Sequence, residues 1–341
     1  MTSGGGNAKP LVLLTNPIDP AGMALLEPHA SVRIAGAVDH DTLRREAGDA
    51  AVIVVRAFLP ADMIEHAPRL LACVRHGAGV DMIPVDAATA AGVIVANVPG
   101  VNARTVAEYC ITQFLMHTRR IAQIDRTLRS AGWAVARPQA DRVTEMHGKS
   151  VGIVGVGNIG RHLAAICHHG FGMRVLGYQR RLDLLPATVE GVELDRIFSD
   201  SDYIALCCPL TPETRHLVDA RRIALMKPSA FIVNVARGPV IDQAALVQAL
   251  RERKIGGAGL DVFETQPLPT GDPLLSFDNT MLTTHVAGLS VESVRRMSII
   301  AAEDTLRILA GEKPVNFINP EVWPAAARRR VALAASTEIR E

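Results

Sequence analysis

Short, largely apolar runs alternate with amphipathic stretches along most of the chain. In the first part of the chain, the predicted strands lie at residues 11–15, 31–34, 51–55, 71–74 and 93–96. Each run is too short for an ordinary helix, and such runs are typical of parallel strands that are covered on both faces. Helically periodic stretches at residues 21–27 and 61–66 lie between them. This part therefore predicts a series of alternating strands and helices.

A second series follows, with predicted strands at residues 151–154, 174–177, 203–207, 230–235, 259–262 and 280–284. Between the two series, residues 105–129 are helically periodic and contain no glycine or proline, which predicts one long connecting helix. Residues 291–310 predict another long helix. The alternation predicts an α/β fold of two doubly wound, parallel-sheet, Rossmann-like domains with a cleft between them.

The length of 341 residues also favours two domains. We expect a discontinuous substrate-binding domain made of residues 8–103 and 287–320, and an NAD(P)-binding domain made of residues 104–286. Residues 321–341 are basic and rich in alanine, and we expect a solvated C-terminal tail there.

Composition excludes several classes of function. Lys and Arg number 36 against 35 Asp and Glu, so no charge imbalance indicates nucleic acid or a membrane surface as a partner. The five cysteines are scattered without a C-x-x-C spacing, which predicts a reduced, metal-free protein. No apolar run approaches the ~20 residues of a spanning helix, and the N-terminus lacks a signal-peptide core. We therefore expect a cytoplasmic protein.

A Gly-x-Gly-x-x-Gly motif follows the predicted strand at residues 151–154 and opens a helical stretch. In a dinucleotide-binding turn, the first glycine makes the tight turn, the second lets the backbone approach a pyrophosphate, and the third lets helix pack on strand. The N–H groups of the new helix then bind the phosphate charge. The predicted cofactor contacts here are Gly155, Gly157, Asn158, Ile159 and Gly160.

The position that usually selects the nucleotide differs from the common pattern. Nineteen residues after Gly160, where an acidic residue is expected to bind the ribose of NAD, the chain has Gln179, followed by Arg180 and Arg181. An arginine can pair with the 2′-phosphate of NADP. Gln179 and Arg180 are therefore predicted cofactor residues, and NADP acceptance is favoured. The alternative is that the arginines are solvated and Gln179 binds NAD.

Four further motifs lie after predicted strands. They are Pro-Leu-Thr-Pro-Glu-Thr-Arg-His at residues 209–216, Asn-Val-Ala-Arg-Gly at 234–238, Gly-Leu-Asp-Val-Phe at 259–263 and Thr-His-Val-Ala-Gly at 284–288. Together with the glycine-rich turn, in this order, they resemble the D-isomer-specific 2-hydroxyacid dehydrogenases over roughly residues 10–320. The resemblance implies hydride transfer between a nicotinamide cofactor and a small 2-keto or 2-hydroxy acid, and a homodimer.

Two residues match the catalytic pair of that family. Arg237 matches the arginine that binds the substrate carboxylate and polarises the carbonyl, a role that suits a fixed guanidinium. His285 matches the acid/base, because reduction of a ketone leaves an alkoxide that must receive a proton. The family resemblance also implies cofactor contacts at Pro209, Thr214, Ala236, Asp261 and Gly288, with the Asp261 carboxylate near the nicotinamide amide.

The third catalytic position departs from the family pattern. Most members have a glutamate five residues after the motif aspartate, where this chain has Gln266, a third predicted catalytic residue. A neutral amide can orient the imidazole but cannot stabilise its charged form. We therefore expect His285 to protonate at lower pH than in relatives with glutamate. Formate dehydrogenases of this family also carry glutamine here, so a formate dehydrogenase-like enzyme is one alternative.

In the first domain, Gly77, Ala78 and Gly79 match the loop whose backbone N–H groups bind the substrate carboxylate. Asn102 is expected to line the cleft, or alternatively to be a polar residue at a helix N-terminus. Arg75, His76 and Arg104 could bind a charged substrate tail.

The sequence thus predicts an NAD(P)-dependent D-2-hydroxyacid dehydrogenase of the glyoxylate/hydroxypyruvate or phosphoglycerate type. The specific acid stays open. A second alternative, from a different class, is a non-catalytic NADH-sensing scaffold of the same fold, as some family members are.

Overall fold

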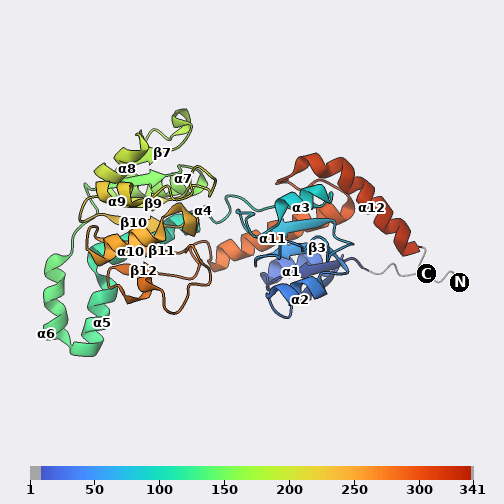
Figure 1. Ribbon diagram of the computed structural model, residues 1–341, viewed down its shortest axis with the longest axis horizontal. Helices are drawn as coiled ribbons and strands as arrows, with labels where there is room; N and C mark the ends of the chain where they lie inside the picture. Colours follow the sequence, from blue (N-terminus) through green and yellow to red (C-terminus); the bar gives the residue numbers. More distant parts are fainter. Residues whose placement is uncertain (1–8, 339–341) are drawn as a thin grey trace. The chain divides into compact units, whose positions relative to one another are not determined.

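The computed structural model describes residues 9–338 of the chain, which form two compact units, each built on a parallel sheet (Figure 1). Unit 1 combines the chain up to Asn102 with the chain from Ser290 onwards, and unit 2 is Ala103–Leu289. The predicted fold class, α/β with two parallel sheets, is confirmed. The assignment of one unit to substrate and the other to nucleotide stays a prediction.

The sheet of unit 1 has five parallel strands in the order β2-β1-β3-β4-β5. The strands are β1 (Leu11–Leu14), β2 (Ser31–Ile34), β3 (Ala50–Val55), β4 (Ala72–Arg75) and β5 (Ile94–Ala96). The apolar side chains of β1, β3 and β4 are almost fully buried, because clusters of packed side chains cover both faces of the sheet. The helices of this unit are α1 (Pro20–Leu26), α2 (His40–Glu46), α3 (Val85–Ala90), α11 (Val291–Ala310) and α12 (Trp323–Glu338).

The late segment of the chain completes unit 1. Helix α11 packs against α1, where a Cβ on Gly22 would lie 2.8 Å from the Ser298 carbonyl oxygen. Residues 321–341 are expected to be a solvated tail, but their described part, up to residue 338, includes a helix that packs on this unit, and residues 339–341 lie outside the described residues. Ala326 is buried, and Arg329 donates to the carbonyl oxygens of Leu70 and Pro68 at 2.7 and 2.8 Å. The small alanine side chains let the helix lie close to unit 1, and one of its basic side chains, Arg329, makes these two hydrogen bonds.

Unit 2 has seven parallel strands in the order β12-β11-β10-β9-β6-β7-β8. They are β6 (Ser150–Val154), β7 (Arg174–Tyr178), β8 (Glu190–Gly191), β9 (Tyr203–Leu206), β10 (Phe231–Asn234), β11 (Gly257–Leu260) and β12 (Thr280–Leu282). The strand order reverses direction between β6 and β9. In open parallel sheets, ligands bind beyond the carboxyl ends of the strands at such a switch point.

The helices of unit 2 are α4 (Ala103–Arg119), α5 (Ile121–Ala131), α6 (Trp133–Ala136), α7 (Asn158–Ala165), α8 (Leu194–Asp200), α9 (Ala220–Leu225) and α10 (Gln243–Arg251). Helix α4 packs against α7 and β10. Helices α5 and α6 lie side by side and extend away from the sheet of their own unit (Figure 1).

Two predicted elements are wrong. Residues 105–129 are not one helix: Arg120 adopts left-handed backbone (φ 52°, ψ 30°), which ends α4 and starts α5 in a new direction. The sequence contains no glycine or proline at this break. Residues 61–66 form successive four-residue turns, such as the one closed by the Met63 N–H and the Pro60 carbonyl oxygen, and Pro68 prevents a longer helix. Across residues 9–338, no helix is long and apolar enough to cross a membrane.

Candidate active site

The three glycines of the turn between β6 and α7 have different surroundings. Gly155 has φ +91°, and a Cβ there would lie 2.7 Å from the Cys208 amide nitrogen at the end of β9. A Cβ on Gly160 would lie 2.5 Å from the Gly155 carbonyl oxygen. At Gly157, by contrast, the space within 4 Å of the Cβ position contains no atom. Two of the glycines are thus required for packing, and the third faces open space.

The open space lies at the start of helix α7. Gly157 is the residue before the helix, and no side chain caps the first N–H groups of the helix. Uncapped N–H groups and the positive end of the helix dipole favour an anion. Because this turn is also at the switch point between β6 and β9, its geometry fits the pyrophosphate of a dinucleotide.

The loop after β9 is shaped by the predicted cofactor residue Thr214. Its hydroxyl donates to the Pro209 carbonyl oxygen at 2.7 Å and accepts from the Thr211 N–H at 2.7 Å. The hydroxyl is therefore used within the loop and shapes it.

The arginines after β7 differ in their pairing. Arg181 forms an exposed ion pair with Asp183 at 2.8 Å, and Gln179 donates to the Arg181 carbonyl oxygen at 2.6 Å. Arg180 is exposed and makes no hydrogen bond or ion pair with any residue in the described part of the chain. Of the two arginines, Arg180 is therefore the one whose guanidinium is available to a phosphate.

The turn that carries Arg237 is built by Asn234, the last residue of β10. The Asn234 side chain accepts from the Ala236 N–H and donates to the Arg237 carbonyl oxygen, both at 3.0 Å, and it is almost fully buried. Asparagine commonly forms turns of this kind with its own backbone. A Cβ on the next residue, Gly238, would overlap the backbone of Phe263. Both features hold Arg237 in place, half buried, after β10.

The loop that carries His285 is held by Asp261, which follows β11. One carboxylate oxygen accepts from the Thr283 hydroxyl at 2.6 Å and from the Val286 N–H at 2.8 Å, and the other accepts from the Ala287 N–H at 2.8 Å. Asp261 is only 2% exposed. Its carboxylate is thus occupied by backbone and hydroxyl donors on both sides of the histidine.

The backbone of His285 is unusual. Its N–H donates to the Asp261 carbonyl oxygen at 2.9 Å, and its φ is +59°, in the left-handed region that residues other than glycine rarely adopt. Such conformations persist only where the surroundings impose them, and they are common at functional sites. The Asp261 contacts supply that constraint.

Gln266 lies half buried in the loop after β11, and its side chain makes no hydrogen bond within the described residues. The nearby Glu264 does not replace it, because its carboxylate accepts from His216 Nε2 at 2.8 Å and lies 3.5 Å from the Gln243 N–H. The remaining predicted cofactor residues of unit 2, Ala236 and Gly288, lie in the loops after β10 and β12. All these loops leave the carboxyl edge of one parallel sheet.

In unit 1, the loop after β4 is organised by Arg75. Its guanidinium donates to the carbonyl oxygens of Val55, His76 and Gly79 at 2.8, 2.9 and 3.0 Å. The amide N–H groups of Ala78 and Gly79 donate to no other atom of the described residues. Two free N–H groups in one loop suit a carboxylate.

The other predicted site residues of unit 1 have different contacts, and these contacts limit what each residue can bind. Arg75 cannot reach a charged substrate tail while it holds its own loop. His76 is 3% exposed and hydrogen-bonded to Ser298 at 2.8 Å, and burial lowers its pKa to about 4, so it is neutral and cannot bind an anion by charge. Arg104 pairs with Glu108 on the surface of α4. Asn102 is the last residue of unit 1 before that helix.

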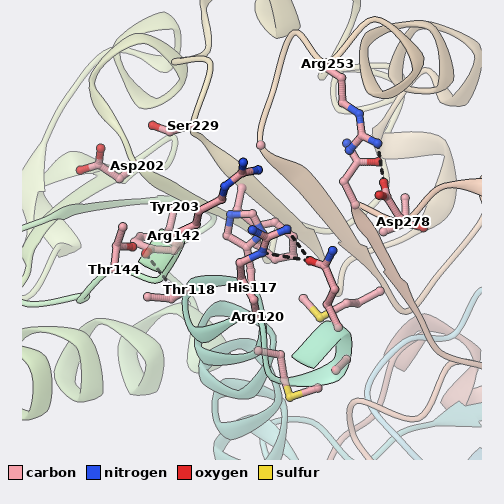
Figure 2. A pocket seen from close by; sticks show the side chains of 18 of the residues that line it. His117, Thr118, Arg120, Arg142, Thr144, Asp202, Tyr203, Ser229, Arg253 and Asp278 are labelled. Atoms are coloured by element: carbon pink, nitrogen blue, oxygen red, sulfur yellow. Dashed lines mark hydrogen bonds and ion pairs between the residues drawn. The ribbon is translucent and has the colours of Figure 1, made fainter. Parts of the chain in front are cut away.

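A cavity of about 360 Å³ lies at the opposite edge of the sheet of unit 2. Figure 2 shows its lining, which includes His117 and Arg120 at the end of α4 and Tyr203 at the start of β9. None of the predicted site residues lines it. Within residues 9–338, His, Cys, Asp and Glu side chains form no group of three that could hold a metal ion.

Sequence reasoning missed the residues that hold the loops, namely Asn234, Thr283 and Arg75. An asparagine directly after a buried strand is a signal for the first of these. Thr283 carries no such local signal, because its partner Asp261 lies 22 residues away. Arg75 bonds to the nearby His76 and Gly79 as well as to Val55, but an arginine after a strand does not by itself indicate that it supports a loop.

Comparison with known proteins adds to this geometry. Residues 111–287 match the family described as D-isomer specific 2-hydroxyacid dehydrogenase, NAD binding domain. The chain is 37% identical to a glyoxylate reductase of Korarchaeum cryptofilum over 92% of this chain and 97% of that protein. It is 37% identical to a D-3-phosphoglycerate dehydrogenase of Methanocaldococcus jannaschii over 90% of this chain and 59% of that protein.

A solved structure is also similar. It is an NADPH-dependent glyoxylate/hydroxypyruvate reductase of Sinorhizobium meliloti in complex with NADP and malonate, 29% identical in sequence. The similarity covers 91% of this chain and 97% of that one, with a TM-score of 0.80.

Proposed function

This chain belongs to the D-isomer-specific 2-hydroxyacid dehydrogenase family, and we propose that it reduces glyoxylate or hydroxypyruvate with NADPH in preference to NADH. The similar glyoxylate reductase, phosphoglycerate dehydrogenase and glyoxylate/hydroxypyruvate reductase are oxidoreductases of this family, and this chain is likewise an oxidoreductase that uses NAD or NADP. The observation that carries the proposal is that Arg237, His285 and the glycine-rich turn all lie on loops that leave the same edge of one parallel sheet.

In unit 2, Arg237 would bind the substrate carboxylate, because a guanidinium offers two parallel N–H donors to a carboxylate. In unit 1, Gly77, Ala78, Gly79 and Asn102 stay predicted substrate residues, and the free N–H groups of Ala78 and Gly79 suit a carboxylate. Because Arg237 is positive, it also stabilises the negative charge that develops on the carbonyl oxygen.

His285 would donate the proton that this oxygen needs. When bound, the nicotinamide cofactor supplies the hydride to the carbonyl carbon, and the oxygen becomes an alkoxide. His285 transfers its proton to that oxygen, giving the hydroxyl of the D-2-hydroxy acid. Gln266, the third predicted catalytic residue, would orient the imidazole without adding charge.

The preference for NADPH rests on Arg180. Its exposed guanidinium makes no hydrogen bond or ion pair within the described residues, although its charge contributes to lowering the pKa of Glu213, whereas Arg181 is paired with Asp183. Arg180→Ala should therefore raise the KM for NADPH by about tenfold or more, because a charge-assisted pair with phosphate is lost, and leave the KM for NADH nearly unchanged. Arg181→Ala is the matched control and should change either KM little. Equal effects of Arg180→Ala on both cofactors would contradict the assignment.

We also propose that two copies associate through helices α5 and α6. Helix α5 has no buried residue, and four large apolar side chains of this hairpin are exposed, namely Ile121, Leu128, Trp133 and Val135, with Trp133 72% exposed. Exposed apolar patches of this kind mark association surfaces. Trp133→Glu should give a monomer in size-exclusion chromatography with light scattering. Val315→Glu, at an exposed valine of unit 1, should not.

The test of the function is oxidation of NADPH and NADH with glyoxylate, hydroxypyruvate, pyruvate and phenylpyruvate. Turnover should be fastest with one of the first two acids, and His285→Ala should lower kcat by about 10³-fold, as expected for loss of a general acid. Formate with NAD⁺ or NADP⁺ tests the alternative that Gln266 suggests. Tight binding of NADPH without turnover of any acid would favour a non-catalytic scaffold and overturn the proposal.

A further inference from the structure

A chain of side-chain hydrogen bonds connects helix α4 to the carboxylate of Asp261. Gln113 Nε2 donates to Tyr109 Oη at 2.5 Å, Tyr109 Oη lies 2.5 Å from Thr283 Oγ1, and Thr283 Oγ1 donates to Asp261 Oδ1 at 2.6 Å. The first two residues lie on α4, and Thr283 follows β12. All four residues belong to unit 2.

The direction of every bond in this chain is fixed by chemistry. A carboxylate only accepts, so Thr283 must donate its single proton to Asp261. Thr283 can then only accept from Tyr109, which must donate its phenolic proton. Tyr109 in turn accepts from the Gln113 amide. No member can reverse its role without breaking a bond.

The surroundings preserve this arrangement. The two ends of the chain, Gln113 and Asp261, are 5% and 2% exposed, and Tyr109 and Thr283 between them are half buried, so exposure to water is limited along the chain. Burial raises the pKa of Tyr109 to about 12, which keeps the phenol protonated and able to donate. Gly259 leaves room for the amide, since a Cβ there would lie 3.0 Å from Gln113 Oε1.

We propose that Tyr109 is a positioning residue for His285: by donating to Thr283, it keeps the Thr283 hydroxyl on Asp261 and so keeps Asp261 on the loop of the histidine. The inference rests on the proposed function of His285. The left-handed backbone of His285 makes the loop dependent on such support, because neighbouring contacts must impose that conformation. Without the phenol, the Thr283 hydroxyl is free to rotate away from Asp261.

The test compares Tyr109→Phe with Tyr203→Phe. Tyr203 is also buried and also bonds through its hydroxyl to a threonine, Thr118 of the same helix α4, at 2.7 Å. Its pair lies at the opposite edge of the sheet, beside the cavity (Figure 2). Each substitution removes one tyrosine hydroxyl that is hydrogen-bonded to a threonine, and the Tyr203 hydroxyl also bonds to Thr144, so both variants should lose stability.

Only Tyr109→Phe should affect the chemistry. We expect its kcat to fall by about three- to tenfold, the range for one lost hydrogen bond, with KM values for the keto acid and NADPH within about twofold of the wild type. The kinetic isotope effect with NADPH deuterated at the transferred hydrogen should rise, because the chemical step becomes slower. Tyr203→Phe should change none of these. Equal kinetics in the two variants would overturn the inference.

Hydrogen exchange gives a reading that does not depend on turnover. The Val286 and Ala287 amides donate to Asp261, so they should exchange at least about fivefold faster in Tyr109→Phe and at the wild-type rate in Tyr203→Phe. If the wild type reduces no keto acid, the proposed function fails, and exchange alone decides the positioning role. Thr283→Val should show the same faster exchange, and adding Tyr109→Phe to it should have no further effect. Unchanged exchange in Tyr109→Phe would overturn the inference.

Discussion

The loop after β4 in unit 1 and the loop after β12 in unit 2 each contain a histidine, and the two loops are held in opposite ways. Arg75, a cation, donates to three carbonyl oxygens of the first loop and its neighbouring strand. Asp261, an anion, accepts two N–H groups and one hydroxyl in the second. The cation uses the carbonyl groups and leaves N–H donors free, whereas the anion uses the N–H donors.

This difference decides which part of each loop is left to act. In the first loop, the backbone N–H groups of Ala78 and Gly79 remain for a ligand, and His76 is buried as a neutral side chain. In the second loop, the N–H groups of Val286 and Ala287 are occupied by Asp261, and the group proposed to act is the side chain of His285. Two histidines that follow strands in similar sequence surroundings therefore have different roles.

The largest effect should come from breaking the anionic support. Asp261→Asn retains the shape of the side chain, but its amide nitrogen must face an N–H group that formerly donated to a carboxylate oxygen. Because hydrogen bonds to charged groups contribute about 1.5–3 kcal/mol, we expect kcat to fall about a hundredfold. Steady-state kinetics with glyoxylate and NADPH measure this.

The matched control for that change is Asp202→Asn. The Asp202 carboxylate also accepts from a backbone N–H and a hydroxyl, both of Ser150 at 2.9 Å, but at the opposite edge of the sheet. This variant should lose stability and keep kcat within about twofold. If both variants lost the same activity, the effect of Asp261 would be on folding alone.

Breaking the cationic support should have a smaller and different effect. Arg75→Met removes the three bonds to carbonyl oxygens, so the N–H groups of Ala78 and Gly79 lose their fixed direction. Since the proposed contact of these groups with the substrate carboxylate would be equally strong in the ground and transition states, KM for the keto acid should rise about tenfold with kcat within threefold. Arg104→Ala, which removes only an exposed pair with Glu108, should change neither. A fall in kcat without a change in KM would contradict this role.

The smallest effect concerns pH and stability. The pKa of His76 is about 4 in the folded protein against 6.5 for a free histidine side chain, with burial as the main cause. Between these values the unfolded chain binds the extra proton, so the folded state loses stability as pH falls from 6.5 towards 4. At pH 5 the loss from this residue is about 2 kcal/mol.

His76→Gln, which retains a hydrogen-bonding group towards Ser298, should reduce the loss of unfolding free energy between pH 7.5 and pH 5 by about that amount. Urea unfolding at the two pH values measures it. His40→Gln, at an exposed histidine of the same unit, is the control and should leave the loss unchanged. An equal loss in His76→Gln and the wild type would mean that His76 is protonated in the folded protein.

The fold class and the family could be predicted from the sequence because their signals are local. A glycine-rich turn, short apolar runs and motifs after strands are each contained in a few residues. The break between α4 and α5 at Arg120 could not be predicted, because arginine rarely adopts left-handed backbone and the sequence has no glycine or proline there. The packing of α12 was also missed, because it depends on contacts of Arg329 with residues far away in the sequence.

The candidate site was predictable in its residue types but not in its supports. Nothing near His76 distinguishes it from a ligand-binding histidine, since its partner Ser298 lies 222 residues further along the chain. Likewise, the link between Tyr109 and Thr283 spans 174 residues. Sequence motifs identify the groups that would touch ligands, whereas the groups that orient them are fixed only by the folded chain.

The discontinuity of unit 1 has a consequence for the order in which the protein forms during synthesis. Residues 103–289 of unit 2 leave the ribosome as one uninterrupted segment and can fold at once, as domains generally do. Unit 1 cannot finish folding until α11 has been synthesised, because this helix packs on α1, β3 and β4. The Ser298 hydroxyl of α11 also accepts a hydrogen bond from the Asp19 N–H and is hydrogen-bonded to His76. Until α11 is made, one face of the first sheet to be synthesised is bare. The earliest-made strands of this protein are thus among the last to be buried, and they are the ones a nascent-chain chaperone would bind.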